Sequence, residues 1–169
     1  MEESITLRPL ALSDKSALAQ LANNKKIWDN VRDYLPHPYG ETDAEEFINL
    51  TLNEDPKQTF AIEFRGALAG VVGLVVQTDV YRKSAEIGYW IGEPFWNKGI
   101  ATKAVGLITQ YGFENLGLNR IYAGIFEYNK ASMVVLEKNG FKQEGISKSA
   151  VLKNGKVWDE YRYFKLREG

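Results

Sequence analysis

The residues best suited to chemistry lie in the stretch Ile91–Thr102, where a glycine separates a strand-like run from a helix-like run. A chain that turns through Gly99 into a helix points several unpaired backbone N–H groups at one spot, and the helix dipole adds partial positive charge there. Such a turn suits a phosphate or pyrophosphate. Lys98 and Lys103 add positive charge beside it. A plain strand-to-helix turn without a ligand explains Gly99 equally well from this stretch alone.

The glycine pattern narrows the kind of phosphate site. It is neither the dinucleotide motif G-x-G-x-x-G nor the P-loop motif G-x-x-x-x-G-K-[ST], so a P-loop nucleotide-binding protein is a remote alternative. Gly88 and Gly92 flank the end of the preceding strand. Because they lack side chains, we expect a ligand or another backbone to approach closely there.

The elements that position this stretch follow from the spacing of apolar residues. Strands are expected at Ile5–Leu10, Thr59–Phe64, Ala67–Thr78, Ala85–Ile91, Asn119–Phe126, Phe141–Leu152 and Lys156–Lys165. Helices are expected to begin at caps Ser13, Thr42 and Asn129 and at Ile100, and glycine turns at Arg65-Gly66 and Asn154-Gly155. The segment Asn23–Gly40 is too rich in proline for a long regular element. The order of elements predicts a mixed α+β domain.

Composition limits the class of protein. A chain of 169 residues fits a single domain over 1–169, and a net charge of −1 argues against a nucleic-acid partner. The absence of cysteine excludes disulfides, thiolate metal sites and a cysteine nucleophile. The acidic start at residues 1–4 does not resemble a signal peptide, and no apolar run approaches the roughly 20 residues of a membrane span. We therefore expect a cytoplasmic monomer or homodimer with no metal and no membrane partner.

Four blocks in the chain resemble one known family. They are Ala85–Ile91, Phe95–Thr102, Asn129–Ser132 and Leu136–Phe141. In this order and spacing they resemble the GNAT superfamily of acetyl-CoA-dependent N-acetyltransferases, and most of all its RimJ/RimL-type branch. The resemblance covers nearly the whole chain. It implies a single GNAT-like domain with a central, mostly antiparallel, twisted sheet of about seven strands. This sheet is splayed between its fourth and fifth strands and is flanked by about four helices.

The resemblance also implies how acetyl-CoA is held. The pyrophosphate is expected on the backbone amides of Asn97, Lys98, Gly99, Ile100, Ala101 and Thr102. The pantetheine is expected to pair with the backbone near Tyr89 and Ile91, with further contacts from Asn129, Ser132 and Lys138. Three of these have plainer explanations, since Asn129 can be only a cap, Ser132 a first-turn residue and Lys138 an exposed lysine. The family's Q/R-x-x-G-x-G/A motif begins here with Trp96, which removes a side-chain contact but leaves the backbone amides.

Acetyl transfer by direct attack in a ternary complex needs a base for the amine, a donor for the oxyanion and a proton for the thiolate. Glu86 is the candidate base, because it is a carboxylate in an apolar strand and matches the family's strand glutamate; alternatively it faces water. By resemblance, the Ile91 amide is the oxyanion donor and Ser132 a candidate acid. Many members place a tyrosine acid where this chain has Leu136. His37 lies in a proline-rich loop and is either structural or catalytic.

The acceptor side is expected to come from Trp28–Tyr39, with Tyr161 and Tyr163 opposite. Its candidate residues are Trp28, Asn30, Asp33, Tyr34 and Glu86, which suit a cationic amine through ring and charge contacts. Trp28 and Tyr34 could instead form the core of this segment. The expected function is therefore acetylation of a primary amine, on a protein N-terminus or a small molecule. Because the tyrosine acid is missing, a non-catalytic CoA-binding or regulatory module is the alternative.

Overall fold

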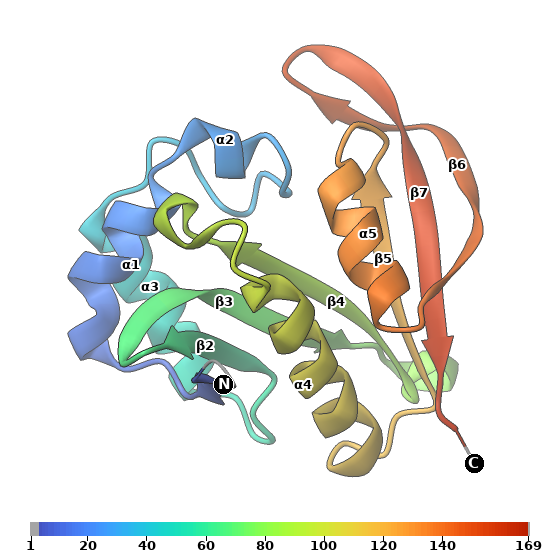
Figure 1. The fold of residues 1–169 in the computed structure, drawn as a ribbon, viewed down its shortest axis with the longest axis horizontal. Helices are drawn as coiled ribbons and strands as arrows, with labels where there is room; N and C mark the ends of the chain where they lie inside the picture. The colour runs from blue at the N-terminus through green and yellow to red at the C-terminus, as the bar shows by residue number, and fades with distance from the viewer. Residues whose placement is uncertain (1–3, 169) are drawn as a thin grey trace. The chain divides into compact units, whose positions relative to one another are not determined.

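The computed structural model describes residues 4–168 (Figure 1). Residues 1–3, on which part of the expectation about a signal peptide rests, lie outside the described residues. Two compact units are present: unit 1 consists of residues 4–73 with Tyr89–Ala104, and unit 2 of Leu74–Gly88 with residues 105–168. The single domain over 1–169 stays a prediction.

The described residues form seven strands in one mixed sheet, in the order β1-β2-β3-β4-β5-β7-β6. The strands are β1 (Ile5–Arg8), β2 (Thr59–Phe64), β3 (Ala67–Val76), β4 (Ser84–Ile91), β5 (Arg120–Phe126), β6 (Lys142–Lys153) and β7 (Lys156–Leu166). The α-helices are α1 (Lys15–Ala22), α2 (Lys25–Trp28), α3 (Glu41–Leu52), α4 (Ile100–Glu114) and α5 (Lys130–Lys138). Short 3-10 turns occur at η1 (Leu12–Asp14), η2 (Asp79–Tyr81) and η3 (Glu93–Phe95). The predicted α+β class with a mostly antiparallel sheet is confirmed.

The parallel pair in this sheet is β4 with β5. Its register places Ser84–Glu86 opposite Arg120–Tyr122, at the start of both strands. Parallel neighbours need a long crossover connection, and α4 provides it here. Glu86 therefore lies at the last of these three β4–β5 pairs, directly across from Tyr122.

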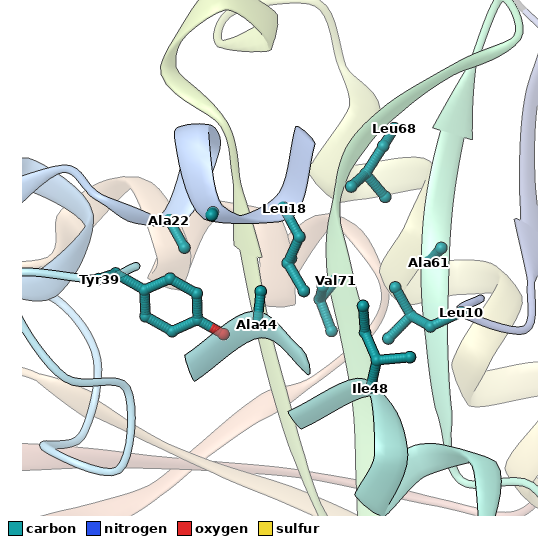
Figure 2. Close-up of a cluster of buried hydrophobic side chains, with 10 residues drawn as sticks. Leu10, Leu18, Ala22, Tyr39, Ala44, Ile48, Ala61, Leu68 and Val71 are labelled. Carbon is teal, nitrogen blue, oxygen red and sulfur yellow. The ribbon is translucent and has the colours of Figure 1, made fainter. Parts of the chain in front are cut away.

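The core of unit 1 is built by α1 and α3 against β2 and β3 (Figure 2). Its buried members are Leu10, Leu18, Ala19, Ala22, Tyr39, Ala44, Ile48, Ala61, Leu68 and Val71. Leu18 and Ala22 are four residues apart on α1, as are Ala44 and Ile48 on α3, so each helix buries one stripe. Burial of a large apolar side chain contributes about 1.5–3 kcal/mol. Since Ala22 and Tyr39 both belong to this core, it fixes both ends of the irregular segment between them.

Two predicted helix caps are wrong, and acidic neighbours explain both. The first helix is preceded by η1. At the start of η1, the Asp14 carboxylate rather than the Ser13 hydroxyl makes the capping bond, by accepting the N–H of Ala11 at 2.8 Å. The second helix begins at Glu41 with Gly40 as its N-cap, not at Thr42. Asp43 accepts the Gly40 N–H at 2.8 Å. The predicted cap at Asn129 and the glycine turns at Gly66 and Gly155 are confirmed.

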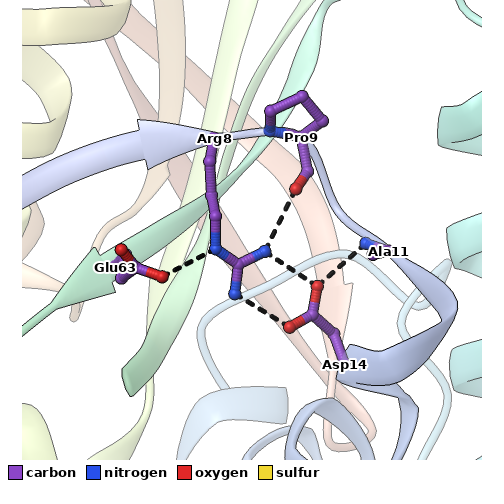
Figure 3. A network of polar contacts seen from close by, with 5 residues as sticks. All are labelled: Arg8, Pro9, Ala11, Asp14 and Glu63. Carbon is purple, nitrogen blue, oxygen red and sulfur yellow. Dashed lines mark hydrogen bonds and ion pairs between the residues drawn. The ribbon is translucent and has the colours of Figure 1, made fainter. Parts of the chain in front are cut away.

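A network around Arg8 connects β1, β2 and η1 within unit 1 (Figure 3). Two guanidinium nitrogens donate to the two carboxylate oxygens of Asp14 at 2.9 Å each, and Nε donates to Glu63 at 2.8 Å. The bidentate geometry makes Asp14 the stronger partner. The Arg8 guanidinium holds the pKa of Asp14 below its ordinary value, while Asp14 raises the pKa of Arg8.

In unit 2, α4 and α5 cover the same face of the strands. A Cβ atom at Gly106 of α4 would lie 3.0 Å from the Asn139 side chain after α5, and one at Gly112 would lie 3.0 Å from Ile121 of β5. The Lys165 ammonium of β7 donates to the Asn139 carbonyl at 2.8 Å. By strand alternation, the opposite face carries Tyr122.

We expect Asp14→Asn to lower the free energy of unfolding by about 1–3 kcal/mol, because Arg8 keeps its charge and loses its bidentate partner. The folded-state pKa of Asp14 is lowered, so this stabilisation is complete above the ordinary pKa of aspartate and is lost as the pH falls through the folded-state value. Denaturant titrations of both proteins at neutral pH and at about pH 3 measure the difference. In Glu63→Gln the bidentate pair remains, and the loss should stay below about 1 kcal/mol. The wild type and Asp14→Asn should differ less in their free energy of unfolding in acid than at neutral pH. A difference that stays the same in acid would contradict this account.

Candidate active site

The strongest candidate for ligand binding is the turn between η3 and α4 in unit 1. Asn97 and Gly99 both have left-handed backbone angles, with φ of +63° and +74°. The N–H of Lys103 donates to the carbonyl of Gly99 at 3.2 Å and so begins the helical bonding of α4. A Cβ atom at Gly99 would meet nothing within 4 Å. The exposed turn therefore presents the amides of the first helical turn, and it fits a bound pyrophosphate.

The turn is held by bonds to neighbouring strands. The indole N–H of Trp96 donates to the carbonyl of Ile91 at 2.7 Å, and the N–H of Gly92 donates to Ala69 of β3 at 2.7 Å. Phe95 packs edge-on against Phe64 of β2, with ring centroids 6.2 Å apart. Trp96 thus has a structural function that sequence reasoning missed, since it closes the end of β4 onto the turn.

The two glycines of the preceding strand differ. A Cβ atom at Gly88 would meet nothing within 4 Å, as expected for room beside a ligand. At Gly92 it would lie 2.6 Å from the Leu21 side chain of α1. The predicted space at Gly92 is therefore filled by the protein itself, because α1 packs on this point. Tyr89 and Ile91 lie in unit 1 with the turn, and Ile91 is buried.

The α5 residues lie in unit 2. The Asn129 side chain accepts the N–H of Ser132 at 3.3 Å, so Asn129 caps α5. Lys138 is exposed in the last turn, about 9 Å along the helix from Ser132 at the usual rise per residue, so the two cannot bind the same small group. Leu136 is fully buried in the core. The position where many family members have a tyrosine acid therefore holds a buried core side chain in this chain.

Glu86 of β4 is half-buried. Its side chain lies on the same face of the sheet as that of Tyr122, its partner residue on β5. Two arginines flank the Tyr122 ring, with Arg162 at 5.4 Å and Arg120 at 5.6 Å from its centroid. Arg162 also donates to Glu160 at 2.8 Å. The side chain of Glu86 is thus on the sheet face away from α4 and α5, where positive charge from two arginines is close to the sheet.

Tyr161 and Tyr163, which were expected opposite the acceptor segment, lie on the face of the unit 2 strands that carries α5. They pair with Ile125 and Ala123, whose side chains are buried. Lys130 of α5 lies 5.0 Å from the Tyr161 ring. Burial raises the pKa of the Tyr163 hydroxyl, and Glu137 of α5 raises it further. The two tyrosines therefore pack against α5 and do not share the face of Glu86.

The acceptor candidates of unit 1 lie on and after α2. Trp28 is half-buried, with its ring 6.2 Å from that of His37. Asn30, Asp33 and Tyr34 are exposed, and Tyr34 is 93% exposed. Tyr34 is therefore not part of a core, and it can meet a ligand. The Asn30 side chain donates back to the Lys26 carbonyl at 2.9 Å.

No group of three or more histidine, cysteine, aspartate or glutamate side chains within residues 4–168 could hold a metal ion. In the same part of the chain, every helix is too short or too polar to cross a membrane.

Comparison with known proteins identifies the class that this fold and turn define. The family model for the acetyltransferase (GNAT) domain matches residues 4–142. "Probable N-acetyltransferase YjcK" of Bacillus subtilis (strain 168) is 39% identical over 97% of this chain and 94% of its own length. The spermidine N(1)-acetyltransferase of Escherichia coli (strain K12) is 32% identical over 84% of this chain and 75% of its own. The structure of RimL, a ribosomal L7/L12 alpha-N-protein acetyltransferase in complex with coenzyme A, matches with a TM-score of 0.83, 26% identity, and coverage of 96% and 93%.

This chain belongs to the GNAT acetyltransferase family. It is an acyltransferase enzyme of the N-acetyltransferase class, and acetyl-CoA is its co-substrate. The resemblance to the RimJ/RimL-type branch is confirmed by the structural match to RimL.

We expect Gly99→Val to weaken CoA binding by at least about tenfold, because a β-branched residue disfavours the left-handed angle that aims the amides. Calorimetric titration with CoA measures the change. Gly66→Val is the matched control, since Gly66 has φ of +82° and equally open surroundings in the β2–β3 turn. Both variants should lose about 1–2 kcal/mol of stability, but only the first should lose affinity. Equal CoA affinity in the two variants would remove the turn from the binding site.

Proposed function

We propose that this enzyme transfers the acetyl group of acetyl-CoA to a primary amine by direct attack within a ternary complex. The observation that carries the proposal is the exposed turn with two left-handed residues before α4, in a chain of the GNAT family. The turn supplies several N–H donors and no negatively charged side chain between Trp96 and Thr102, which suits a pyrophosphate.

The residues assigned to the cofactor follow from this turn and from the resemblance to the family. The backbone amides of residues 97–102 hold the pyrophosphate, and the backbone at Tyr89 and Ile91 pairs with the pantetheine. Asn129 and Ser132 contact the cofactor from the first turn of α5. Lys138 meets its phosphate-bearing end, which agrees with its distance along α5 from Ser132. Bound acetyl-CoA supplies an acetyl thioester, and the chain's residues orient it.

Glu86 is the proposed base. An α-amine with a pKa near 7.7–8.0 is neutral in roughly one molecule in ten at neutral pH, whereas a lysine-like amine near 10.4 is neutral in about one in a few thousand. The second kind therefore needs a proton acceptor. A half-buried carboxylate on β4 can take this proton, directly or through water.

The remaining steps are assigned to Ile91 and Ser132. The Ile91 amide donates to the oxyanion, and the next peptide group along the chain is fixed by the bond from the Trp96 indole to the Ile91 carbonyl. Ser132 gives the proton to the departing thiolate, because the buried Leu136 offers none.

For the acceptor we propose an amine that carries a single positive charge near the site. Two relatives are named for a polyamine and for a protein N-terminus, and both acceptors present a primary amine. Residues 23–41 here hold three lysines or arginines and three aspartates or glutamates, so the segment has no acidic surplus for a polycation. Trp28 and the exposed Tyr34 offer ring faces, while Asn30 and Asp33 offer polar contacts.

A panel of amines tests the function. Thiol release from acetyl-CoA is measured with spermidine, a peptide bearing a free N-terminus, and a small monoamine. We expect the peptide or the monoamine to give the higher kcat/KM. If folded protein that binds CoA releases thiol with none of the three, the proposed transfer to amines is wrong.

We expect Glu86→Gln to lower kcat/KM by about 10–100-fold at neutral pH, because the amine loses its proton acceptor. The deficit should shrink as the pH rises, since more of the amine deprotonates unaided. Rates between neutral pH and about pH 10 measure this. Glu160→Gln, which removes a carboxylate paired with Arg162 in the same unit, should leave the shape of the profile unchanged. A Glu86→Gln profile parallel to the wild type would remove Glu86 from the mechanism.

We keep as proposals a single domain over 1–169, a cytoplasmic location, a monomer or homodimer, and the lack of nucleic-acid and membrane partners. The nearly neutral net charge of −1 supports the lack of a nucleic-acid partner.

A further inference from the structure

The carboxylate of Glu93 joins two segments of unit 1 that are far apart in sequence. Its Oε1 accepts from the Asn24 side-chain amide at 2.8 Å, and its Oε2 accepts from the Lys26 ammonium at 2.8 Å. Lys26, and then Asn24, hold the pKa of Glu93 below its usual range. The carboxylate is therefore ionised at neutral pH and binds α2 through both of its oxygens.

On the α2 side, this contact adds to few others. The helix has a single turn, Lys25–Trp28, and Ile27 is its buried residue. The Asn24 carbonyl oxygen accepts the Lys26 N–H at 2.9 Å and caps the helix, while its amide nitrogen donates to Glu93. The same asparagine thus starts α2 and connects it to η3. An isolated helix this short is not stable, so tertiary contacts set its position.

On the other side, Glu93 belongs to the rigid approach to the ligand turn. It is the first residue of η3, and its carbonyl accepts the N–H of Trp96 at 3.1 Å. The residue before it, Gly92, is bonded to Ala69 of β3, and Trp96 is bonded to Ile91. The backbone of Glu93 is therefore fixed to the strands, while its side chain holds α2.

We infer that Glu93 is a positioning residue that couples the cofactor turn to the amine-binding segment on and after α2. This inference rests on the proposed function, because it takes the turn as the acetyl-CoA site and Trp28 as part of the amine site. A fixed turn places Glu93, Glu93 places Asn24 and Lys26, and these place Trp28. A ligand in the exposed turn restricts the motion of this segment further, so Glu93 holds α2 more firmly in the position that binds the amine, and the two ligands bind cooperatively.

The positioning role can be distinguished from a small contribution of the ion pair to stability. The side chains of Lys26 and Glu93 are 67% and 40% exposed, and such pairs contribute little to stability. Loss of the pair should therefore leave the fold and the turn intact. The expected change is in the affinity for the amine, which depends on where α2 lies.

The main experiment compares Glu93→Gln, Lys26→Met and the double variant with the wild type. We expect the amine KM to rise about threefold to fivefold in each single variant, with kcat and the CoA Kd changed by less than about twofold. The double variant should rise no further than the larger single effect, because both changes break one contact.

A second measurement reports the coupling itself. The CoA Kd is measured by calorimetry with and without saturating amine. In the wild type we expect the amine to tighten CoA binding about threefold to fivefold, and in Glu93→Gln this effect should disappear. The exchanged pair Lys26→Glu with Glu93→Lys should restore part of the coupling, since the ion pair is rebuilt in reverse but a lysine cannot accept from the Asn24 amide.

Two matched controls remove unit 1 ion pairs away from α2. Glu63→Gln removes a carboxylate paired with Arg8, and Lys15→Met removes a lysine 3.9 Å from Glu45. Both should keep the wild-type amine KM and coupling.

The outcomes separate this inference from the proposed function. If the wild type releases no thiol with any amine, the proposed function fails, and the coupling inference fails with it. If the wild type is active and Glu93→Gln keeps the wild-type amine KM and coupling, only the inference is wrong. An equal loss of CoA affinity and amine affinity would also overturn it, because Glu93 would then act on the turn alone.

Discussion

The structure depends on one constraint, which is the need to satisfy the backbone N–H groups that begin α4. These groups have no partner within the helix, so the chain must offer them to an acceptor from outside. The left-handed angles at Asn97 and Gly99 set the approach of the chain, and the bonds from Trp96 and Gly92 fix it to β4 and β3. A pyrophosphate is a suitable acceptor for donors that are held in this way, which is the basis of the proposed cofactor site.

The two units carry different parts of the chemistry. Unit 1 contains the turn, the end of β4 and the segment on and after α2, and its core of α1 and α3 fixes both ends of that segment. Unit 2 contains Glu86, the cap of α5 and the arginines around Tyr122. The amides proposed for the pyrophosphate are thus in the first unit, and the residues proposed for the proton transfers are in the second.

Local signals in the sequence predicted local structure well. Asn129 caps α5, and Gly66, Gly99 and Gly155 adopt left-handed angles, because each depends only on a few neighbouring residues. Ser13 and Thr42 are not caps because the helical turns begin earlier, at Ala11 and Gly40, whose N–H groups are accepted by the carboxylates of Asp14 and Asp43. The sheet face of Tyr161 and Tyr163 could not be predicted, since the sequence pattern does not show where α5 packs. The contact of Glu93 with Asn24 spans 69 positions, and no pattern in the sequence indicates it.

The bond between the Trp96 indole and the Ile91 carbonyl has a consequence for how this enzyme can be observed. Trp96 is 37% exposed and directly precedes the left-handed residue that opens the ligand turn. Indole emission depends on the hydrogen bond of its nitrogen and on the water around the ring. The chain thus has a built-in fluorophore beside the amides proposed to bind the pyrophosphate. With the other three tryptophans replaced by phenylalanine, its spectrum would follow occupation of the turn without any attached dye.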